Sequence, residues 1–124
     1  MIRGVRGAVT VKENNETEII EATRMLIRQM IQENNIEAEA VASVFISVTE
    51  ELTAAFPAKA MRSLEGWTYV PVMCMREIPV EGSLPKCIRV MMHVNSDSPQ
   101  HNISHIYLRD AVRLRPDLNA SSTT

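Results

Sequence analysis

The sequence predicts an α+β domain in which one mixed sheet of about five strands carries one long and one short helix. The chain has 124 residues, the size of a single domain, and about two thirds of the surface of such a chain is buried on folding. One long segment has apolar residues at helical spacing, while several shorter segments are continuously apolar or alternate between apolar and polar residues. A hydrophobic content of 45% and a charged content of 23% are typical of globular proteins and exclude a disordered chain.

Composition also limits the cellular location. No apolar stretch approaches the roughly 18 residues of a membrane span, and residues 1–8 lack the apolar region of a signal peptide, so we expect no membrane association. The two cysteines, Cys74 and Cys87, are too few for a disulfide framework and suit a reducing compartment. We therefore expect a cytoplasmic protein.

Charge is distributed unevenly, although the net charge is only −2. Residues 13–51 carry nine glutamates against two arginines, and the segments on either side are basic. This layout argues against a nucleic-acid footprint spread over the domain. Arginine outnumbers lysine by ten to three. The excess favours bidentate capture of a carboxylate or phosphate, but composition bias alone also explains it.

The first strand and the long helix are predicted in the N-terminal third. Residues 2–12 alternate well enough to form a strand. Gly4 and Gly7 weaken its interior and often mark the close approach of another backbone or a ligand. Asn15, with Glu18 three residues later, is typical of a helix start. From Ile19 to Ile31 apolar residues recur at helical spacing, and the Asn34–Asn35 pair ends the helix.

The middle of the chain predicts three strands and the short helix. Residues 41–49 are nearly continuously apolar, as expected for a strand buried on both faces. Residues 54–64 can form a short helix if Pro57 lies in its first turn. Further strands are expected at residues 68–75 and 87–95.

The last third is more irregular. Residues 78–86, with two prolines and a glycine, connect the two preceding strands. Residues 98–104 predict a turn or short helix, and residues 106–115 a last strand with an irregularity near Asp110. The polar tail, residues 119–124, has almost nothing to bury and should add little to stability.

Two helices can cover only one face of such a sheet. The strands at residues 41–49 and 88–94 are apolar on both faces. A second copy of the chain would supply the missing cover, so we expect a homo-oligomer.

Arg89 is the residue hardest to explain by folding alone, because it lies within an apolar strand. An uncompensated buried charge costs several kcal/mol, roughly, so this guanidinium must be paired, for instance with Glu77, or must bind a ligand. Arg6 poses the same question on a second strand, and Arg113 and Arg115 on a third. Arginines from several strands that point to one place would form an anion pocket.

Other chemistry finds little support in the sequence. Cys74 has no histidine near it to act as a base, and a buried inert thiol is the commoner state. His101 and His105 have metal-ligand spacing, but no cysteine or acidic cluster completes a site. The chain also lacks a glycine-rich phosphate loop, a nucleophile elbow and a Cys-x-x-Cys motif. We expect neither a metal nor a cofactor.

Several blocks occur together along the chain: Ile2-Arg-Gly-Val-Arg-Gly-Ala, Phe56-Pro-Ala-Lys-Ala, Gly66-Trp-Thr-Tyr-Val-Pro-Val, Cys74-Met, Cys87-Ile-Arg-Val-Met-Met, Tyr107-Leu and Leu114-Arg-Pro-Asp-Leu. In order and spacing they resemble the monofunctional bacterial chorismate mutases of the small trimeric α/β-barrel class. The resemblance implies one domain over residues 1–118, a flexible tail at 119–124, and a trimer that forms a pseudo α/β barrel. It also implies an isomerase that rearranges chorismate to prephenate, for phenylalanine and tyrosine synthesis, without a cofactor.

The resemblance assigns roles to particular residues. Arg89 would donate to the ether oxygen and to a carboxylate of chorismate. Arg6 and Tyr107 would hold a carboxylate, and Glu77 and Cys74 the ring hydroxyl. The pocket would also be lined by Phe56, Ala58, Lys59, Arg62, Val72 and Met73, with Leu114 and Arg115 near its mouth.

The resemblance also places the pockets between subunits, so that residues 56–62 would come from the neighbouring chain. Met73 stands where a smaller polar residue is often found, which removes any hydroxyl contact there. Cys74 and Glu77, three residues apart, would face opposite ways on a regular strand, so sharing one pocket requires a twist or bulge before Pro79. The alternative function is a trimeric module that binds a small carboxylate without catalysis. Glu77 and Cys74 favour the enzyme, because an anion binder needs no hydroxyl partner.

Overall fold

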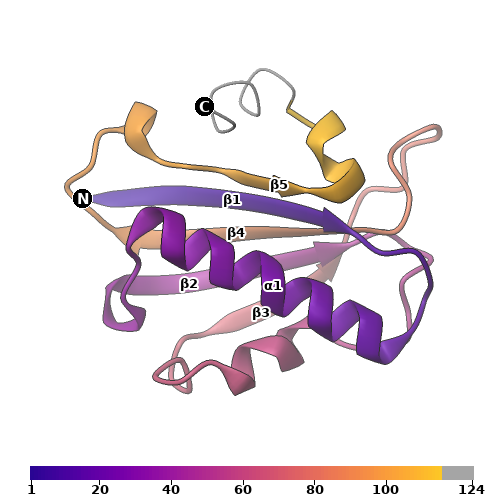
Figure 1. Ribbon diagram of the computed structural model, residues 1–124, viewed down its shortest axis with the longest axis horizontal. Helices are drawn as coiled ribbons and strands as arrows, with labels where there is room; N and C mark the ends of the chain where they lie inside the picture. Colours follow the sequence, from indigo (N-terminus) through magenta and orange to yellow (C-terminus); the bar gives the residue numbers. More distant parts are fainter. Residues whose placement is uncertain (116–124) are drawn as a thin grey trace.

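The computed structural model describes residues 1–115, which form one five-stranded sheet with a helix across one face (Figure 1). The strands are β1 (Ile2–Thr10), β2 (Val41–Val48), β3 (Val72–Arg76), β4 (Cys87–Asn95) and β5 (Ile106–Leu108), in the spatial order β3-β2-β4-β1-β5. β4 pairs antiparallel with both β1 and β2, whereas β5 and β3 run parallel to β1 and β2. The predicted mixed sheet is therefore confirmed. The predicted boundary at residue 118 and the tail at 119–124 lie outside the described residues.

The long helix α1 (Glu16–Asn34) is confirmed with the predicted signals at both ends. The Asn15 side chain accepts a hydrogen bond from the Glu18 N–H at 3.1 Å. The Glu18 carboxylate does not return to Asn15; it accepts the Lys12 N–H and so fixes the loop that enters the helix. At the other end Asn35 has a φ of 51° and its N–H donates back to the last turn, as is common for asparagine in a helix C-cap.

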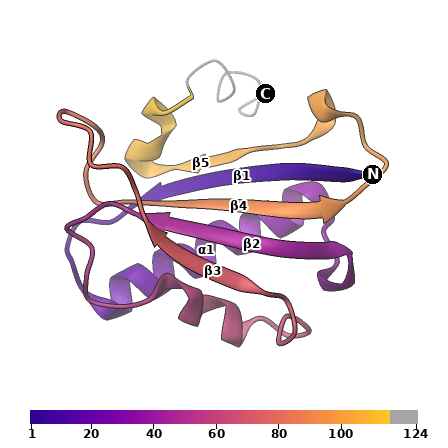
Figure 2. The same ribbon diagram turned by 180° about the vertical axis from the view of Figure 1, so that it is seen from behind.

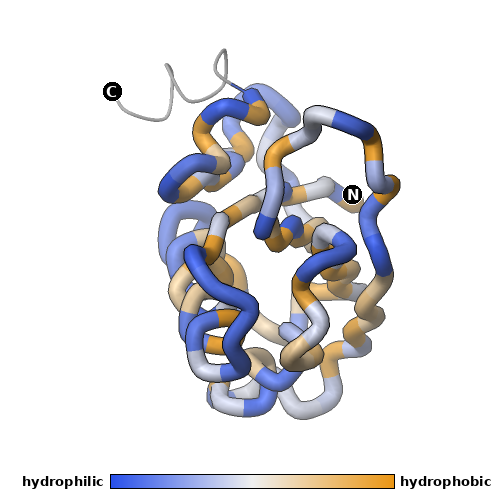
Figure 3. The backbone as a smooth tube through the Cα atoms, turned by 90° about the vertical axis from the view of Figure 1, so that its right-hand side faces the viewer, coloured by the Kyte–Doolittle hydropathy of each residue, from blue (hydrophilic) through white to orange (hydrophobic). Residues whose placement is uncertain are grey.

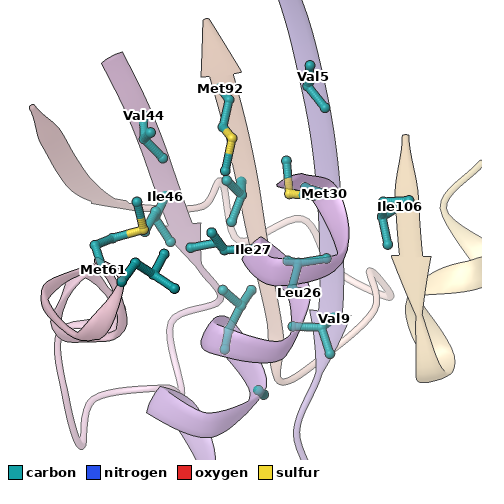
Figure 4. Close-up of a cluster of buried hydrophobic side chains, with 14 of the residues drawn as sticks. Val5, Val9, Leu26, Ile27, Met30, Val44, Ile46, Met61, Met92 and Ile106 are labelled. Atoms are coloured by element: carbon teal, nitrogen blue, oxygen red, sulfur yellow. The ribbon is translucent and has the colours of Figure 1, made fainter. Parts of the chain in front are cut away.

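The core lies between α1 and one face of the sheet. Leu26, Ile27 and Met30 of α1 are fully buried there among residues of β1, β2 and β4 (Figure 4). Burying one such side chain stabilises the fold by roughly 1.5–3 kcal/mol. A Cβ on Gly7 would lie 2.5 Å from the Met30 sulfur and 2.9 Å from Leu26, so the close approach expected at this glycine is that of the helix.

Short 3₁₀ helices complete the chain: η1 (Ala38–Ala40), η2 (Pro57–Ser63), η3 (Gln100–Asn102) and η4 (Arg109–Arg113). η2 is the predicted short helix, with Pro57 at its start and with Ala60 and Met61 buried. The turn or short helix expected at residues 98–104 is η3.

Two predicted strands were too long by several residues, whereas those at residues 2–12 and 41–49 were too long by only one or two. β3 begins at Val72 because residues 67–70 form a turn in which the Val70 N–H donates to the Trp67 carbonyl at 3.1 Å. β5 ends at Leu108 because Arg109 adopts a left-handed φ of 55°, after which the chain turns into η4. Thr10 stabilises that turn: its carbonyl accepts from the Arg109 guanidinium and its hydroxyl from the Asp110 N–H.

The second face of the sheet is open in the single chain. Seen from behind, the strands lie in front of α1, and no helix of residues 1–115 covers them (Figure 2). Phe45 and Met75 are about two-fifths exposed and Met73 is 60% exposed. The expectation that residues 41–49 are buried on both faces is therefore wrong for one copy, because Phe45 points away from the core.

Hydrophobic and hydrophilic residues are intermixed along the backbone. In the side view, segments of both kinds follow one another along the tube (Figure 3). Within residues 1–115, no helix is long and apolar enough to cross a membrane.

Candidate active site

A cavity of about 500 Å³ lies on the open face of the sheet, over β1 and β4 and beside β5. The alternation of β1 and β4 directs the side chains of Arg6 and Arg89 to this face, away from the core. Six of the predicted residues line the cavity: Arg6, Glu77, Arg89, Tyr107, Leu114 and Arg115. The structure therefore brings Arg6, Arg89 and Arg115 together with Glu77. Arg113, which was predicted on the same strand as Arg115, instead ends η4 and does not line this cavity.

Arg89 and Glu77, which both line this cavity, form an ion pair. The Arg89 Nε lies 3.6 Å from a Glu77 carboxylate oxygen, and the Arg89 side chain is 49% exposed. The premise that this guanidinium is buried in an apolar strand is therefore wrong, because its side of the strand faces the open cavity. Exposed pairs of this kind contribute about 0–1 kcal/mol to stability. Stabilisation of the fold by the pair with Glu77 therefore explains little of why an arginine occurs at position 89.

The Glu77 carboxylate is held from two sides. The Ser47 hydroxyl of β2 donates to one oxygen at 3.1 Å, and the Ile78 N–H donates to the other at 3.0 Å. The Glu77 N–H itself donates to the Val48 carbonyl, which extends the pairing with β2 past the end of β3. Ser47 was not predicted as a site residue, although it is one of only two polar residues in β2 and stands opposite Arg89 in the register.

Tyr107 forms part of a small second core beneath the cavity. It is buried with Ala8, Cys87 and Ala111. Burial raises the pKa of the Cys87 thiol, and the neighbouring Arg89 opposes that rise without cancelling it. Cys87 is thus a protonated packing residue and not a nucleophile.

His105 lies directly behind Arg6. Its Nδ1 accepts a hydrogen bond from the Arg6 backbone N–H at 3.0 Å. Burial, followed by the positive charges of Arg6 and Arg115, lowers the pKa of His105. Within residues 1–115 no group of three His, Cys, Asp or Glu side chains could hold a metal ion, so the spacing of His101 and His105 does not build a metal site there.

Acidification is expected to destabilise the protein through His105. Because its pKa is lowered from the ordinary 6.5, the unfolded chain binds more protons, and the unfolding free energy falls as the pH drops from 6.5 through the lowered pKa. Burial acts to raise the pKa of Glu51, but hydrogen bonds from the Thr49 hydroxyl and the Lys86 N–H outweigh burial and lower this pKa. Glu51 therefore changes the unfolding free energy only when the pH falls below 4.5. Melting temperatures between about pH 7 and pH 5 should fall more steeply for the wild type than for His105→Asn. Equal slopes would contradict this assignment.

A second cavity, of about 560 Å³, contains three more predicted residues: Phe56, Lys59 and Cys74. It lies beside η2, and Met75 and Arg76 border both cavities. Phe56 is 72% exposed. Burial raises the pKa of the Cys74 thiol, and the adjacent Ala58 backbone opposes that rise only in part, so the thiol is a neutral group here.

Four predicted residues, Ala58, Arg62, Val72 and Met73, line neither of these two cavities in the described chain. Cys74 and Glu77 also fail to share a cavity. Cys74 lies on the face of β3 that packs against the core, whereas Glu77 follows the end of the strand and lines the first cavity. The regular alternation of β3 separates them, and one chain does not bring the whole predicted site together.

Comparison with known proteins shows the family to which the chain belongs. The family model described as chorismate mutase type I matches residues 2–118. Chorismate mutase AroH of Bacillus subtilis is 52% identical over 124 residues, covering 100% of this chain and 98% of that protein. AroH of Thermus thermophilus is 50% identical over 122 residues, covering 98% and 99%. The solved structure of a chorismate mutase from Clostridium thermocellum superposes with a TM-score of 0.85 at 48% identity, covering 88% of this chain and 96% of that one. The chain belongs to the type I chorismate mutases.

Proposed function

We propose that this chorismate mutase converts chorismate to prephenate in a composite site, with Arg89 as the residue that stabilises the transition state. The observation that carries the proposal is the placement of Arg89 on the open sheet face, beside Glu77 and in one cavity with Arg6 and Tyr107. Family membership favours the enzyme over the alternative, a carboxylate-binding module without catalysis.

The reaction explains how the site can work with cations and without a nucleophilic step. Chorismate is a dicarboxylate with an enolpyruvyl ether and a ring hydroxyl, and its rearrangement is intramolecular, so the protein need not supply a base or a covalent intermediate. The barrier falls if the substrate is held in the compact conformer in which the reacting carbons meet. It also falls if the negative charge that grows on the ether oxygen is stabilised as the C–O bond breaks.

Arg89 is suited to the second task. A fixed guanidinium interacts more strongly with the charge of the transition state than with the neutral ether of the substrate, and it therefore accelerates the chemical step. Glu77 holds the guanidinium on one side and is itself fixed by Ser47 and the Ile78 N–H. In the proposed complex Glu77 also accepts the ring hydroxyl.

Arg6 and Tyr107 are suited to the first task, since they line the same cavity from neighbouring strands. A guanidinium binds a carboxylate through two parallel hydrogen bonds, which fixes the orientation as well as the position of the substrate. Leu114 and Arg115 border the cavity beyond η4.

We assign the remaining residues to a neighbouring copy of the chain. β3 is an edge strand, and the second cavity opens beside it with Phe56 at its exposed rim. If the second cavity of one copy faces the first cavity of the next, Phe56, Lys59 and Cys74 complete the wall opposite Arg89. Ala58, Arg62, Val72 and Met73 would then come from the same neighbour. Cys74 and Glu77 meet in this arrangement without any bulge in β3.

A homotrimer is the expected assembly. Closing the open sheet face removes Phe45, Met73 and Met75 from water, and each apolar Å² buried contributes roughly 25 cal/mol. Light scattering in dilute buffer should give about three times the 13.9 kDa mass of the chain. An active, stable monomer would contradict both the composite site and this account of the open face.

The activity itself is tested by an absorbance assay. Purified protein mixed with chorismate should deplete it and produce prephenate without an added metal or cofactor. Saturable binding of chorismate without turnover would instead support the non-catalytic module. A cytoplasmic location and the lack of a nucleic-acid partner remain expectations from the sequence.

A further inference from the structure

The backbone of Arg6 has an unusual partner. Parallel pairing between β1 and β5 begins at Gly7 and Ile106. The Arg6 N–H lies one residue before that first pair, where β5 has not yet begun. The His105 ring supplies the acceptor instead, with a distance of 3.0 Å from the Arg6 nitrogen to Nδ1. The His105 side chain therefore extends the β1–β5 hydrogen bonding by one residue, to Arg6, whose side chain lines the cavity.

The segment that carries His105 is itself clamped by helix α1. The Asn34 side-chain amide donates to the Ser104 carbonyl at 2.8 Å, and its oxygen accepts the Ser104 N–H at 2.8 Å. The same amide donates to the Met30 carbonyl in the last turn of α1. Both backbone groups of the residue before His105 are thus fixed by the end of the helix, which limits the positions open to the ring.

The ring can accept this bond in only one form. A backbone N–H is a donor, so Nδ1 must be unprotonated and the neutral ring must carry its proton on Nε2. Burial and the nearby charges of Arg6 and Arg115 favour the neutral ring, because they lower the pKa of His105. The surroundings and the hydrogen bond therefore require the same state.

We propose that His105 is a positioning residue for the substrate carboxylate, which it serves by holding the backbone of Arg6 while Asn34 fixes the segment behind it. This inference rests on the proposed function, in which Arg6 binds that carboxylate. His105 touches no reacting atom in this scheme. Its contribution is to fix the backbone of Arg6, and with it the position from which the Arg6 side chain extends into the cavity.

The expected effect is on substrate binding. Arg6 binds the same carboxylate in the substrate and in the transition state. If Arg6 is held less firmly, the binding of both is weakened equally, so KM rises and kcat is nearly unchanged. Loss of one neutral hydrogen bond corresponds to roughly a three- to ten-fold increase in KM. A residue needed only for folding would lower the melting temperature without this division between KM and kcat.

Two amide variants separate the acceptor from its surroundings. In His105→Asn the side-chain oxygen stands where Nδ1 stands, whereas in His105→Gln it stands one bond further out. We expect His105→Asn to keep KM within about two-fold of the wild type and His105→Gln to show the full increase. His101→Asn, at an exposed histidine in η3, is the control and should match the wild type. Equal KM values for all three variants, or a loss confined to kcat, would overturn the proposal.

Asn34→Ala tests the hydrogen bonds that hold the segment before His105. This variant keeps His105 but removes the bonds to Ser104, so we expect it to raise KM as well. An unchanged KM would show that Asn34 does not help to position His105.

Nitrogen NMR of the histidine rings tests the inference without any substrate. At neutral pH the His105 ring should be neutral, with its proton on Nε2 and with Nδ1 as the acceptor. A proton on Nδ1 would overturn the inference even if the enzyme turned over chorismate normally. An inactive wild type in which His105 shows the expected form would count against the proposed function alone, because the hydrogen bond to Arg6 would stand.

Discussion

Replacing Arg89 with glutamine is expected to lower kcat by roughly 10²–10³-fold in a protein that still folds and binds chorismate. The neutral amide cannot stabilise the charge that develops on the ether oxygen, so the loss should appear in kcat as well as in kcat/KM. Arg89→Lys should recover only part of the rate, because one ammonium cannot reproduce the two-pronged guanidinium. Arg28→Gln, at an exposed position on α1, is the matched control and should leave kcat unchanged.

The same variant distinguishes catalysis from folding. The Arg89 side chain is half-exposed and lies 3.6 Å from Glu77, so its removal should cost about 0–1 kcal/mol of stability. A purely structural ion pair predicts that activity falls only in proportion to unfolding. Near-normal kcat in folded Arg89→Gln or Arg89→Ala protein would defeat the electrostatic mechanism.

Two inactive variants should restore activity when they are assembled together. Arg89→Gln damages the first cavity, and Phe56→Asp damages the second by placing a carboxylate against the dicarboxylate substrate. If each site takes one cavity from each of two neighbouring copies, random co-assembly leaves about a quarter of the sites with both halves intact. The chains should be unfolded, mixed in equal amounts and refolded, and the recovered rate compared with that of refolded wild type.

Lesions in the same half provide the control. Arg89→Gln mixed with Glu77→Gln should restore nothing, because every site then contains at least one damaged copy of the same cavity. Sites contained within single chains would give no recovery from either mixture. If activity recovers in the mixture of Arg89→Gln with Phe56→Asp and not in the mixture of Arg89→Gln with Glu77→Gln, the opposite wall comes from the second copy.

The elements that were predicted with correct bounds are those determined by local pattern. α1 combines a continuous helical stripe with an asparagine at each end, and β4 was predicted from Cys87 to Asn95 as observed. β5 was predicted too long because the signal that ends it is not local. Thr10, about a hundred residues earlier, accepts the hydrogen bonds that turn the chain at Arg109. No sequence pattern near residue 109 records that contact.

Local sequence patterns also revealed only part of the site. An arginine within an apolar strand identified Arg89, yet the inference that it is buried failed because the apolar residues around it belong to two different faces. The support that Ser47 gives to Glu77 depends on the pairing of β2 with β3 and β4, which periodicity does not specify. Within one chain Cys74 and Glu77 line different cavities, and the proposed meeting of the two across neighbouring copies concerns packing that no local sequence pattern records.

In the proposed site one chain supplies Arg89 and its neighbour supplies the opposite wall. A crystal structure with a stable bicyclic dicarboxylate that mimics the transition state is the decisive experiment. We expect the Arg89 guanidinium about 3 Å from the ether oxygen of the ligand, with Arg6 on a carboxylate of the ligand and Phe56 and Cys74 of an adjacent copy across from it. A ligand bound away from Arg89, or one enclosed by the residues of a single chain, would rule out this composite site.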